Sequence, residues 1–435
     1  MQSSINATVF PSKLYIEPTT FCNLGCEMCV KQAPGNDIIE GSLSPLVFDK
    51  LAPVFNHLES VVFSGIGEPL LYPNLEGLIS SARNLLPQNC RIGIQTNGFL
   101  LHDYRIDSLL EAGVNVFCLS LDSVSPDFFR QVRRGGELGS LQTAFTRLGS
   151  KVHKKHKVRF GIEFVLMKQN MNELPTVIRW AADNGASFAI VTHVLPYKSE
   201  MEVEAVNSPN LNISRELYNT YKFACKDQNL DLDEYLKNRW KYHFKKNKNA
   251  DEKALADLGK RMIEEAYSRN IPLHLKNLMS EEDSTLLEAA ELFGEAQKIA
   301  EETDLESILP ELLPKYERQC HFVEEGSLFV SWDGKVYPCY YLWHQYTFYQ
   351  NGLPLKATSF PIGDLNRQRI DEIWNGQQVT FFRQQVLEYK YPYCRNCNLG
   401  PCNLFTAKQF EYDCYAIEIP CGSCPWCGGL LHCLQ

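Results

Sequence analysis

Apolar runs and helical stripes alternate along the first two hundred residues. Apolar segments over residues 14–17, 59–64, 91–96, 116–121, 158–166 and 188–194 have the length of buried strands. Helical stripes lie between several of them, at 47–58, 74–86 and 103–112, with Ser44 and Pro45 as a helix start and Gly113 as a helix end. This repetition predicts a parallel sheet with helical crossovers. Polar residues follow the strands, as at the carboxyl ends of parallel α/β barrels. We therefore expect an α/β fold with a partial (β/α)6 barrel of the TIM type, although periodicity alone does not distinguish it from an open sheet.

The pattern changes after residue 197. Charged residues dominate residues 199–315, and apolar residues recur there at helical spacing, as in Leu286, Ala290 and Phe293. We expect a helical insertion or linker over residues 198–319, with one isolated strand over 271–275. It is either a solvated spacer or a platform for a substrate or partner.

Residues 320–435 form the third predicted region. We expect a hairpin here, with one strand over 327–331, a turn over 332–335 and a second strand over 335–339. A helical element that includes 370–374 and 381–382 follows. Glycine, proline and cysteine are dense here and apolar periodicity is poor. Metal binding can supply the folding energy that such a segment lacks. We expect a small, cysteine-rich α+β domain here, after a barrel domain over residues 1–197.

Charge and hydropathy narrow the class of protein. The net charge of −9 and the pI near 5.7 argue against nucleic acid as the main partner. No apolar run reaches the length that spans a bilayer, and the first residues lack the basic and apolar regions of a signal peptide. We expect a cytoplasmic protein without a membrane partner.

The sixteen cysteines are unevenly placed. A reducing compartment disfavours structural disulfides, so clustered cysteines there indicate metal ligands. Cys90, Cys118 and Cys225 are isolated and are typical of small buried hydrophobic residues. The candidate ligands are Cys22, Cys26, Cys29, Cys320, Cys339, Cys394, Cys397, Cys402, Cys414, Cys421, Cys424, Cys427 and Cys433.

The first three of these cysteines have the spacing Cys-x3-Cys-x2-Cys, after a short strand. Three thiolates can hold three irons of a four-iron, four-sulfur cluster and leave the fourth iron open to a ligand. A zinc knuckle or three unrelated core cysteines are the alternatives, although structural zinc normally takes four protein ligands. In the C-terminal region Cys-x2-Cys occurs three times, which zinc ribbons and iron–sulfur clusters both explain.

The cysteine triad of Cys22, Cys26 and Cys29, together with the loops that follow it over residues 12–197, resembles the radical S-adenosylmethionine (SAM) enzymes. The resemblance implies that Cys22, Cys26 and Cys29 bind a four-iron cluster whose open iron chelates SAM. It also implies SAM contacts from the glycine-rich loop and later strand ends: Gly65, Gly67 and Glu68 near the amino group, Ser120 and Asp122 near the ribose, and Arg133 or Arg134 at the carboxylate. Met28 stands where the family usually has an aromatic residue near the adenine.

The C-terminal region resembles the SPASM/twitch extension, which carries auxiliary iron–sulfur clusters. Cys320, Gly334 and Cys339 fit its opening, and Cys394 and Cys397 fit its Cys-x2-Cys. Cys402 comes one residue early, and the next expected cysteine position is Thr406. The resemblance implies two auxiliary four-iron clusters, with the assignment of cysteines to clusters left open.

Two features bear on the substrate. Trp426 and the closing segment 428–433 are similar to the tails of maturases for tungsten-cofactor oxidoreductases. Tyr340 stands where sulfatase-maturing relatives have an aspartate base, which argues against sulfatase maturation.

The implied function is reductive cleavage of SAM to a 5′-deoxyadenosyl radical that abstracts hydrogen from a peptide or protein. A flavodoxin or ferredoxin would supply the electron. Tyr340 and Glu163 are candidate catalytic residues, and His193 is a weaker candidate because a core role is more common. The alternatives are a zinc-rich scaffold, an electron-transfer protein that uses only the C-terminal clusters, and a maturase for a tungsten-cofactor oxidoreductase.

Overall fold

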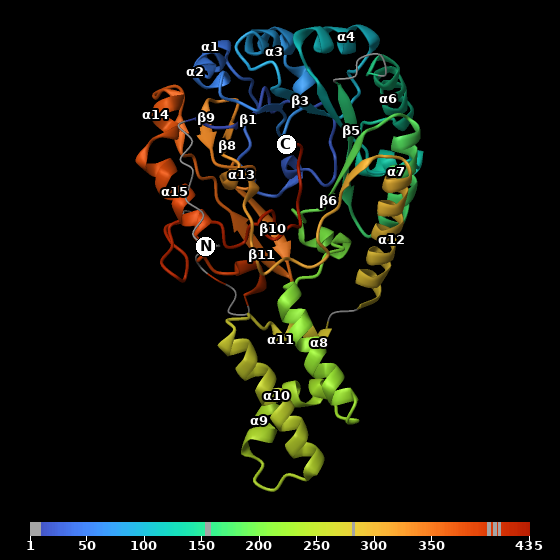
Figure 1. Cartoon of the computed structure of the whole chain (residues 1–435), viewed down its shortest axis with the longest axis vertical. Helices are drawn as coiled ribbons and strands as arrows, with labels where there is room; N and C mark the ends of the chain where they lie inside the picture. Colours follow the sequence, from blue (N-terminus) through green and yellow to red (C-terminus); the bar gives the residue numbers. More distant parts are fainter. Residues whose placement is uncertain (1–9, 153–157, 281–282, 398–401, 403–406, 408–409) are drawn as a thin grey trace.

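The computed structural model describes residues 10–152, 158–280, 283–397, 402, 407 and 410–435. A ten-stranded sheet has the order β12-β9-β8-β1-β2-β3-β4-β5-β6-β7. Its six central strands are parallel and match the predicted ones: β1 (Lys13–Ile16), β2 (Ser60–Phe63), β3 (Arg91–Thr96), β4 (Val116–Ser120), β5 (Arg159–Leu166) and β6 (Phe188–His193). The strands curve around the C-terminal tail (Figure 1). The predicted α/β class with a partial barrel is confirmed.

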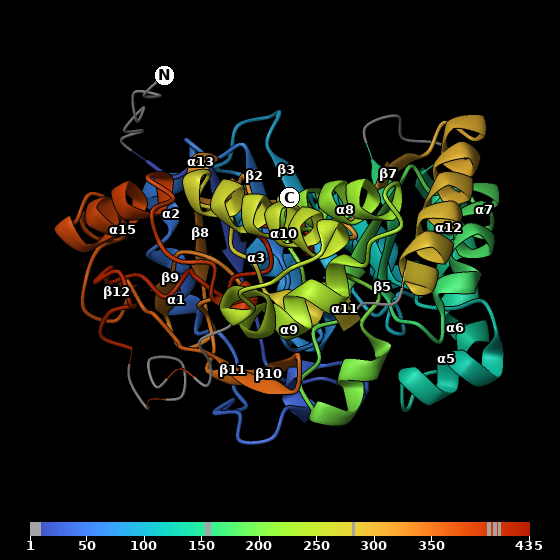
Figure 2. The ribbon, with the colours of Figure 1, turned by 90° about the horizontal axis from the view of Figure 1, so that it is seen from below.

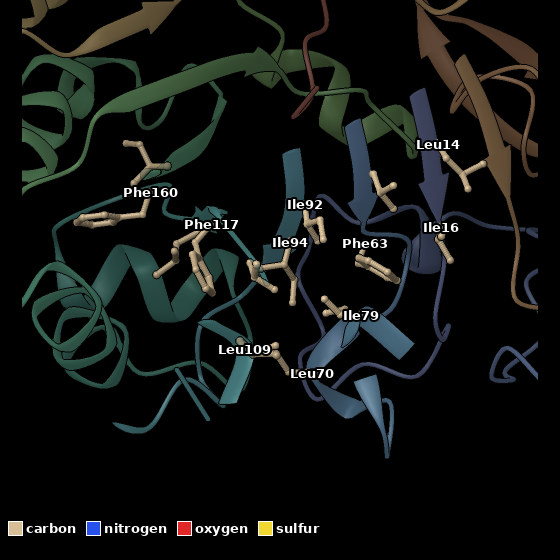
Figure 3. Packing of buried hydrophobic residues seen from close by; sticks show 14 of the residues in the cluster. Leu14, Ile16, Phe63, Leu70, Ile79, Ile92, Ile94, Leu109, Phe117 and Phe160 are labelled. Atoms are coloured by element: carbon tan, nitrogen blue, oxygen red, sulfur yellow. The ribbon is translucent and has the colours of Figure 1, made fainter. Parts of the chain in front are cut away.

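Helices cover the outer face of this sheet. They are α1 (Pro45–Asp49), α2 (Ala52–Phe55), α3 (Leu75–Arg83), α4 (Asp103–Ala112), α5 (Pro126–Val132), α6 (Leu138–Val152) and α7 (Leu174–Asp183). Figure 3 shows strand residues such as Ile92 and Ile94 packing against Ile79 of α3 and Leu109 of α4. Gly113 ends α4 with a φ of 109°, as predicted. The stripe over 47–58 forms two short helices instead of one, because Pro53 supplies no N–H to continue α1.

Later segments extend both edges of the barrel sheet. Helix α12 (Asp283–Glu302) lies beside α7 and leads into β7 (Glu306–Ile308), which pairs in parallel with β6. On the other edge, β8 (Ser327–Val330) pairs in parallel with β1 and turns back into β9 (Lys335–Tyr337), which pairs with β12 (Gly363–Asp364). Parts of the insertion and of the cysteine-rich region thus complete the barrel.

Four helices of the insertion project from the body of the molecule (Figure 1). This arm comprises α8 (Asn212–Lys226), α9 (Leu232–Phe244), α10 (Ala250–Ser268) and α11 (Leu275–Ser280). It has its own apolar core, which includes Leu217, Leu258 and Met262. The strand expected over 271–275 is not formed: α11 begins at Leu275, and the Ser214 hydroxyl donates to the carbonyl of Pro272, a residue without an N–H for a strand ladder.

The remaining C-terminal elements surround the cysteines. They are α13 (His321–Glu324), the antiparallel pair β10 (Tyr346–Gln350) and β11 (Leu353–Ala357), α14 (Ile370–Trp374) and α15 (Gln377–Leu387). The last residues then enter the centre of the curved sheet, where Figures 1 and 2 both place the C-terminus. Within the described residues, no helix has the length and apolar character to cross a membrane.

Candidate functional site

A cavity of about 350 Å³ lies at the carboxyl ends of the barrel strands. All three triad cysteines line it, together with the loop after β2, the ends of β3, β4, β5 and β6, and the C-terminal region. The predicted site residues in this lining are Cys22, Cys26, Cys29, Met28, Gly65, Gly67, Glu68, Ser120, Arg133, Glu163, His193, Tyr340 and Cys433. Segments distant in sequence thus meet at one site.

The triad loop is fixed to the segment that follows α5. The Gly25 N–H donates to the Arg134 carbonyl at 2.9 Å, and the Glu27 N–H donates to the Val132 carbonyl at 2.9 Å. Burial, together with smaller effects of the neighbouring Cys26 and Cys22, raises the pKa of Cys29 to about 11. Three neighbouring thiols that are neutral by themselves form a suitable donor set for a cationic iron cluster, which binds thiolates.

Arg133 reaches the triad, and Asp122 holds it in place. The Arg133 Nε donates to Asp122 Oδ2 at 2.7 Å, and Nη1 lies 3.9 Å from Cys26 Sγ. Asp122 is fully buried, outside the cavity lining, and its Oδ1 accepts the Val165 N–H at 2.9 Å. Asp122 is therefore placed to position Arg133. Arg134 is 67% exposed and pairs with Glu27, so Arg133 is the arginine of this cavity.

The glycine-rich loop after β2 touches the backbone of the triad loop. A Cβ on Gly67 would lie 2.2 Å from the Thr19 carbonyl oxygen, so only glycine fits there. The buried Glu68 carboxylate accepts hydrogen bonds from the Thr96 hydroxyl at 2.6 Å and from the Asn97 N–H at 2.8 Å. Burial raises the pKa of Glu68, and these hydrogen bonds oppose the rise. The loop is thus joined to the end of β3.

Glu163 and Tyr340 face the cavity from β5 and from the segment after β9. Gln95 Nε2 donates to Glu163 Oε2, and the Tyr340 hydroxyl hydrogen-bonds with Ser64. Burial outweighs the opposing effect of the nearby Arg133 charge, and the pKa of Glu163 is raised to about 7. A carboxyl group that titrates near neutral pH can act as a general acid or base.

Unpartnered ring nitrogens line the side of the cavity formed by β6 and the C-terminal region. His193 Nε2 lies 3.0 Å from the Glu311 carbonyl oxygen and must donate to it, so Nδ1 carries the lone pair. Burial lowers the pKa of His193 to about 4, which keeps the ring neutral. His193 Nδ1, Trp343 Nε1 and His344 Nε2 have no hydrogen-bond partner among the described residues. Buried polar atoms normally have a partner, which a polar ligand or an ordered water would supply here.

The C-terminal cysteines form two groups. In the inner group, the thiols of Cys320 and Cys424 both hydrogen-bond with Cys427, and Cys339 and Cys421 lie beside them. In the outer group, burial raises the pKa of Cys394, and the neighbouring Cys414, Cys397 and Cys402 add to the rise. No three Cys, His, Asp or Glu side chains in the described parts of the chain converge as for a single metal ion.

Several residues of the site were not anticipated from the sequence. Glu17, at the end of β1, is fully buried and accepts the Ile66 N–H at 3.2 Å, which fixes the glycine-rich loop. Gln95, Thr96 and Asn97 end β3 at the cavity. Their polarity at a strand's carboxyl end was an available signal. Trp343, His344 and Tyr197 carry no sequence signal, since tertiary folding alone brings them to the cavity.

Comparison with known families identifies two regions. Residues 16–181 match the radical SAM superfamily, and residues 320–398 match SPASM, an iron–sulfur cluster-binding domain.

Relatives in sequence and in structure cover different shares of this chain. The chain is 26% identical over 426 residues to the tungsten-containing aldehyde ferredoxin oxidoreductase cofactor-modifying protein of Pyrococcus furiosus, covering 97% of this chain and 96% of that protein. It is 27% identical over 229 residues to a probable GTP 3′,8-cyclase of Methanococcus maripaludis, covering 52% and 70%. The structure of Streptococcus suis SuiB bound to precursor peptide SuiA aligns with a TM-score of 0.50 at 12% identity, covering 95% of this chain and 76% of SuiB. That likeness supports the fold.

Proposed function

This chain carries a radical SAM domain and a SPASM domain, and we propose that it cleaves SAM reductively to mature a metal-cofactor oxidoreductase. The single observation that carries the SAM chemistry is the cavity that joins the three-cysteine loop, the glycine-rich loop and Arg133. The fold families imply a four-iron cluster with SAM and auxiliary iron–sulfur clusters.

The residues around the cavity fit these groups. Cys22, Cys26 and Cys29 would hold the cluster, which supplies the electron that cleaves bound SAM to methionine and a 5′-deoxyadenosyl radical. Gly67 lets the glycine-rich loop pack directly against the backbone of the triad loop, so that both loops line the cavity. Arg133, fixed by Asp122, offers guanidinium N–H groups to a carboxylate.

Other residues would orient and protect the reaction. The Glu68 carboxylate already accepts the Thr96 hydroxyl and the Leu70 N–H at Oε1 and the Asn97 N–H at Oε2, so Oε2 could accept one further hydrogen bond from an ammonium group. Met28 and Tyr197 line the cavity and would exclude water from the radical. Glu163 would hold or release a proton near neutral pH, and Tyr340 would share one with Ser64.

The maturase assignment rests on a similarity that extends over the whole chain. The relative from Pyrococcus furiosus is named as a protein that modifies the cofactor of a tungsten-containing aldehyde ferredoxin oxidoreductase, and the alignment covers 97% of this chain. The cyclase relatives align over smaller parts of this chain. The substrate is therefore a cofactor or cofactor-bearing protein, with flavodoxin or ferredoxin as reductant.

Peptide modification is the second candidate. SuiB, which shares the fold, binds a precursor peptide. The unpartnered His193 Nδ1 can accept an amide N–H and the Trp343 Nε1 can donate to an amide carbonyl, as a peptide substrate would require.

The proposed SAM cleavage is tested on anaerobically reconstituted protein with SAM and dithionite. We expect 5′-deoxyadenosine from the wild type and none from a variant with Cys22, Cys26 and Cys29 all changed to alanine. Cys225→Ala, a buried cysteine in the arm, is the matched control and should behave as wild type. Equal deoxyadenosine formation by the triad variant would refute the proposal.

A further inference from the structure

The last six residues, 430–435, lie along the interior of the curved sheet. The Leu430 carbonyl accepts the His193 N–H at 3.3 Å, and the His432 N–H donates to the Thr192 hydroxyl at 3.3 Å. Leu434 lies against Gly93 of β3, and Lys13 of β1 donates to Gln435 at 3.3 Å. Contacts with β6, β3 and β1 therefore hold the tail along its length, from the cavity to Lys13 at the start of β1, and fix the positions of its side chains.

Cys433 is the tail residue with reactive chemistry, and it lines the same cavity as the triad. It also borders the space around the inner cysteine group, so it lies between the two sites. The inner group contains five cysteines and the outer group four, whereas two four-iron clusters need eight ligands. The other nine cysteines can therefore supply eight ligands without Cys433, whose ligand role stays a prediction.

The surroundings of Cys433 keep it as a neutral thiol. Burial raises its pKa above the ordinary value, and the nearby Glu163 carboxylate raises it further. His193 and Trp343 line this cavity and are less than a tenth exposed, and among the described residues neither His193 Nδ1 nor Trp343 Nε1 has a hydrogen-bond partner. A substrate bound there would therefore lie in the same space as an S–H group, whose bond is weaker than most C–H bonds.

We propose that Cys433 donates a hydrogen atom to the substrate radical in this cavity, an inference that rests on the proposed radical function. The Cys433 S–H bond breaks, a C–H bond forms on the substrate, and a thiyl radical remains on Sγ. One electron, which a reduced iron–sulfur cluster would supply, and one proton, for which Glu163 is the nearby source, would restore the thiol. The substrate thus undergoes no net oxidation, which distinguishes this outcome from oxidative modification.

The test needs no substrate, because the 5′-deoxyadenosyl radical can itself take a hydrogen atom from the thiol. Holoenzyme is incubated anaerobically with SAM and dithionite in D2O, where the thiol carries deuterium, and 5′-deoxyadenosine is analysed by mass spectrometry. We expect deuterium in the wild-type product and its loss to buffer background in Cys433→Ser, whose O–H bond is too strong to donate. Cys118→Ala, a buried neighbour in β4 outside the cavity lining, should retain the wild-type label.

Iron content separates the donor role from a ligand role. Cys433→Ser should keep the iron content and the cluster spectrum of the wild type. A loss of about four irons in this variant would make Cys433 a cluster ligand and overturn the proposal. Unlabelled deoxyadenosine from the wild type, or an undiminished label in Cys433→Ser, would also overturn it while leaving SAM cleavage intact. No deoxyadenosine from the wild type would overturn the function and this inference together.

Discussion

Buried charges at the cavity are held by specific partners. Asp122 and Arg133 form an ion pair with side chains 0% and 9% exposed, and Asp122 also accepts a backbone N–H from β5. A buried charge is tolerated only when it is paired and hydrogen-bonded. The pair therefore fixes the arginine beside Cys26, and its loss should affect both stability and the site.

We expect Asp122→Asn to destabilise the protein by about 3–5 kcal/mol, because it leaves the Arg133 charge buried and unpaired. Urea denaturation of the reconstituted protein measures this change. Asp127→Asn, which affects an exposed ion pair with Arg130, is the control and should leave the unfolding midpoint unchanged. Equal midpoints for the two variants would contradict the prediction.

Glu163 makes stability depend on pH. Its folded-state pKa of about 7 lies above the ordinary value of 4.5, so the folded state binds an extra proton between these values. The stabilising contribution of the protonated form is complete below about pH 4.5 and is lost as pH rises through about 7. As pH rises from about 4.5 through about 7, the free energy of unfolding of Glu163→Gln should increase relative to that of the wild type by up to about 3 kcal/mol. Denaturation curves of both proteins at a series of pH values measure this change. A difference in unfolding free energy that does not vary with pH would contradict the prediction.

At the scale of elements, the loops after β1 and β2 interlock. The Glu68 N–H donates to the Phe21 carbonyl at 2.8 Å, and Gly67 lies directly against the backbone of residues 19–21. The glycine-rich loop and the triad loop thus form one unit, fixed further by Glu17 and by the end of β3. A side chain at this contact would separate the two loops that line the cavity.

Gly67→Ala should abolish detectable SAM binding, because its Cβ would overlap the Thr19 and Phe21 carbonyl oxygens. Equilibrium dialysis with labelled SAM on the reconstituted protein measures this loss. Gly139→Ala in α6, where the new Cβ meets nothing within 4 Å, should bind SAM as wild type does. Wild-type affinity in Gly67→Ala would show that the loops can separate without cost to the site.

At the scale of the molecule, three regions share one sheet. The insertion contributes β7 and the cysteine-rich region contributes β8, so the barrel edges depend on residues far along the chain. The cysteine-rich region in turn places its inner group of thiols next to the cavity. Its outer group includes Cys394, whose Sγ lies near Gly422 and hence near the inner group. A cluster bound by the inner group would therefore lie between the cavity and a cluster bound by the outer group.

Removal of each cysteine group should have a separate effect on iron content. A Cys394→Ala, Cys397→Ala variant and a Cys320→Ala, Cys427→Ala variant should each lose about four of about twelve irons, since each pair belongs to one group. Metal analysis and EPR spectra of the reduced proteins measure the loss. Zinc in place of iron, or a loss of about eight irons from either variant, would contradict the separation into two groups.

The sequence by itself determined the elements and the chemistry that depends on local spacing. Period and length identify the six parallel strands, and the Cys-x3-Cys-x2-Cys spacing brings three thiols together because a short loop cannot separate them. The glycine-rich segment is recognisable for the same reason. These features involve residues that are neighbours in the chain.

Only the tertiary structure decided which distant residues meet. It placed Asp122 behind Arg133, divided the C-terminal cysteines into two groups, and moved Cys433 into the cavity. No spacing rule predicts these contacts, because they depend on strand pairing and on the packing of segments hundreds of residues apart. The tail follows the barrel interior because the partial barrel leaves apolar strand faces that Leu434 covers.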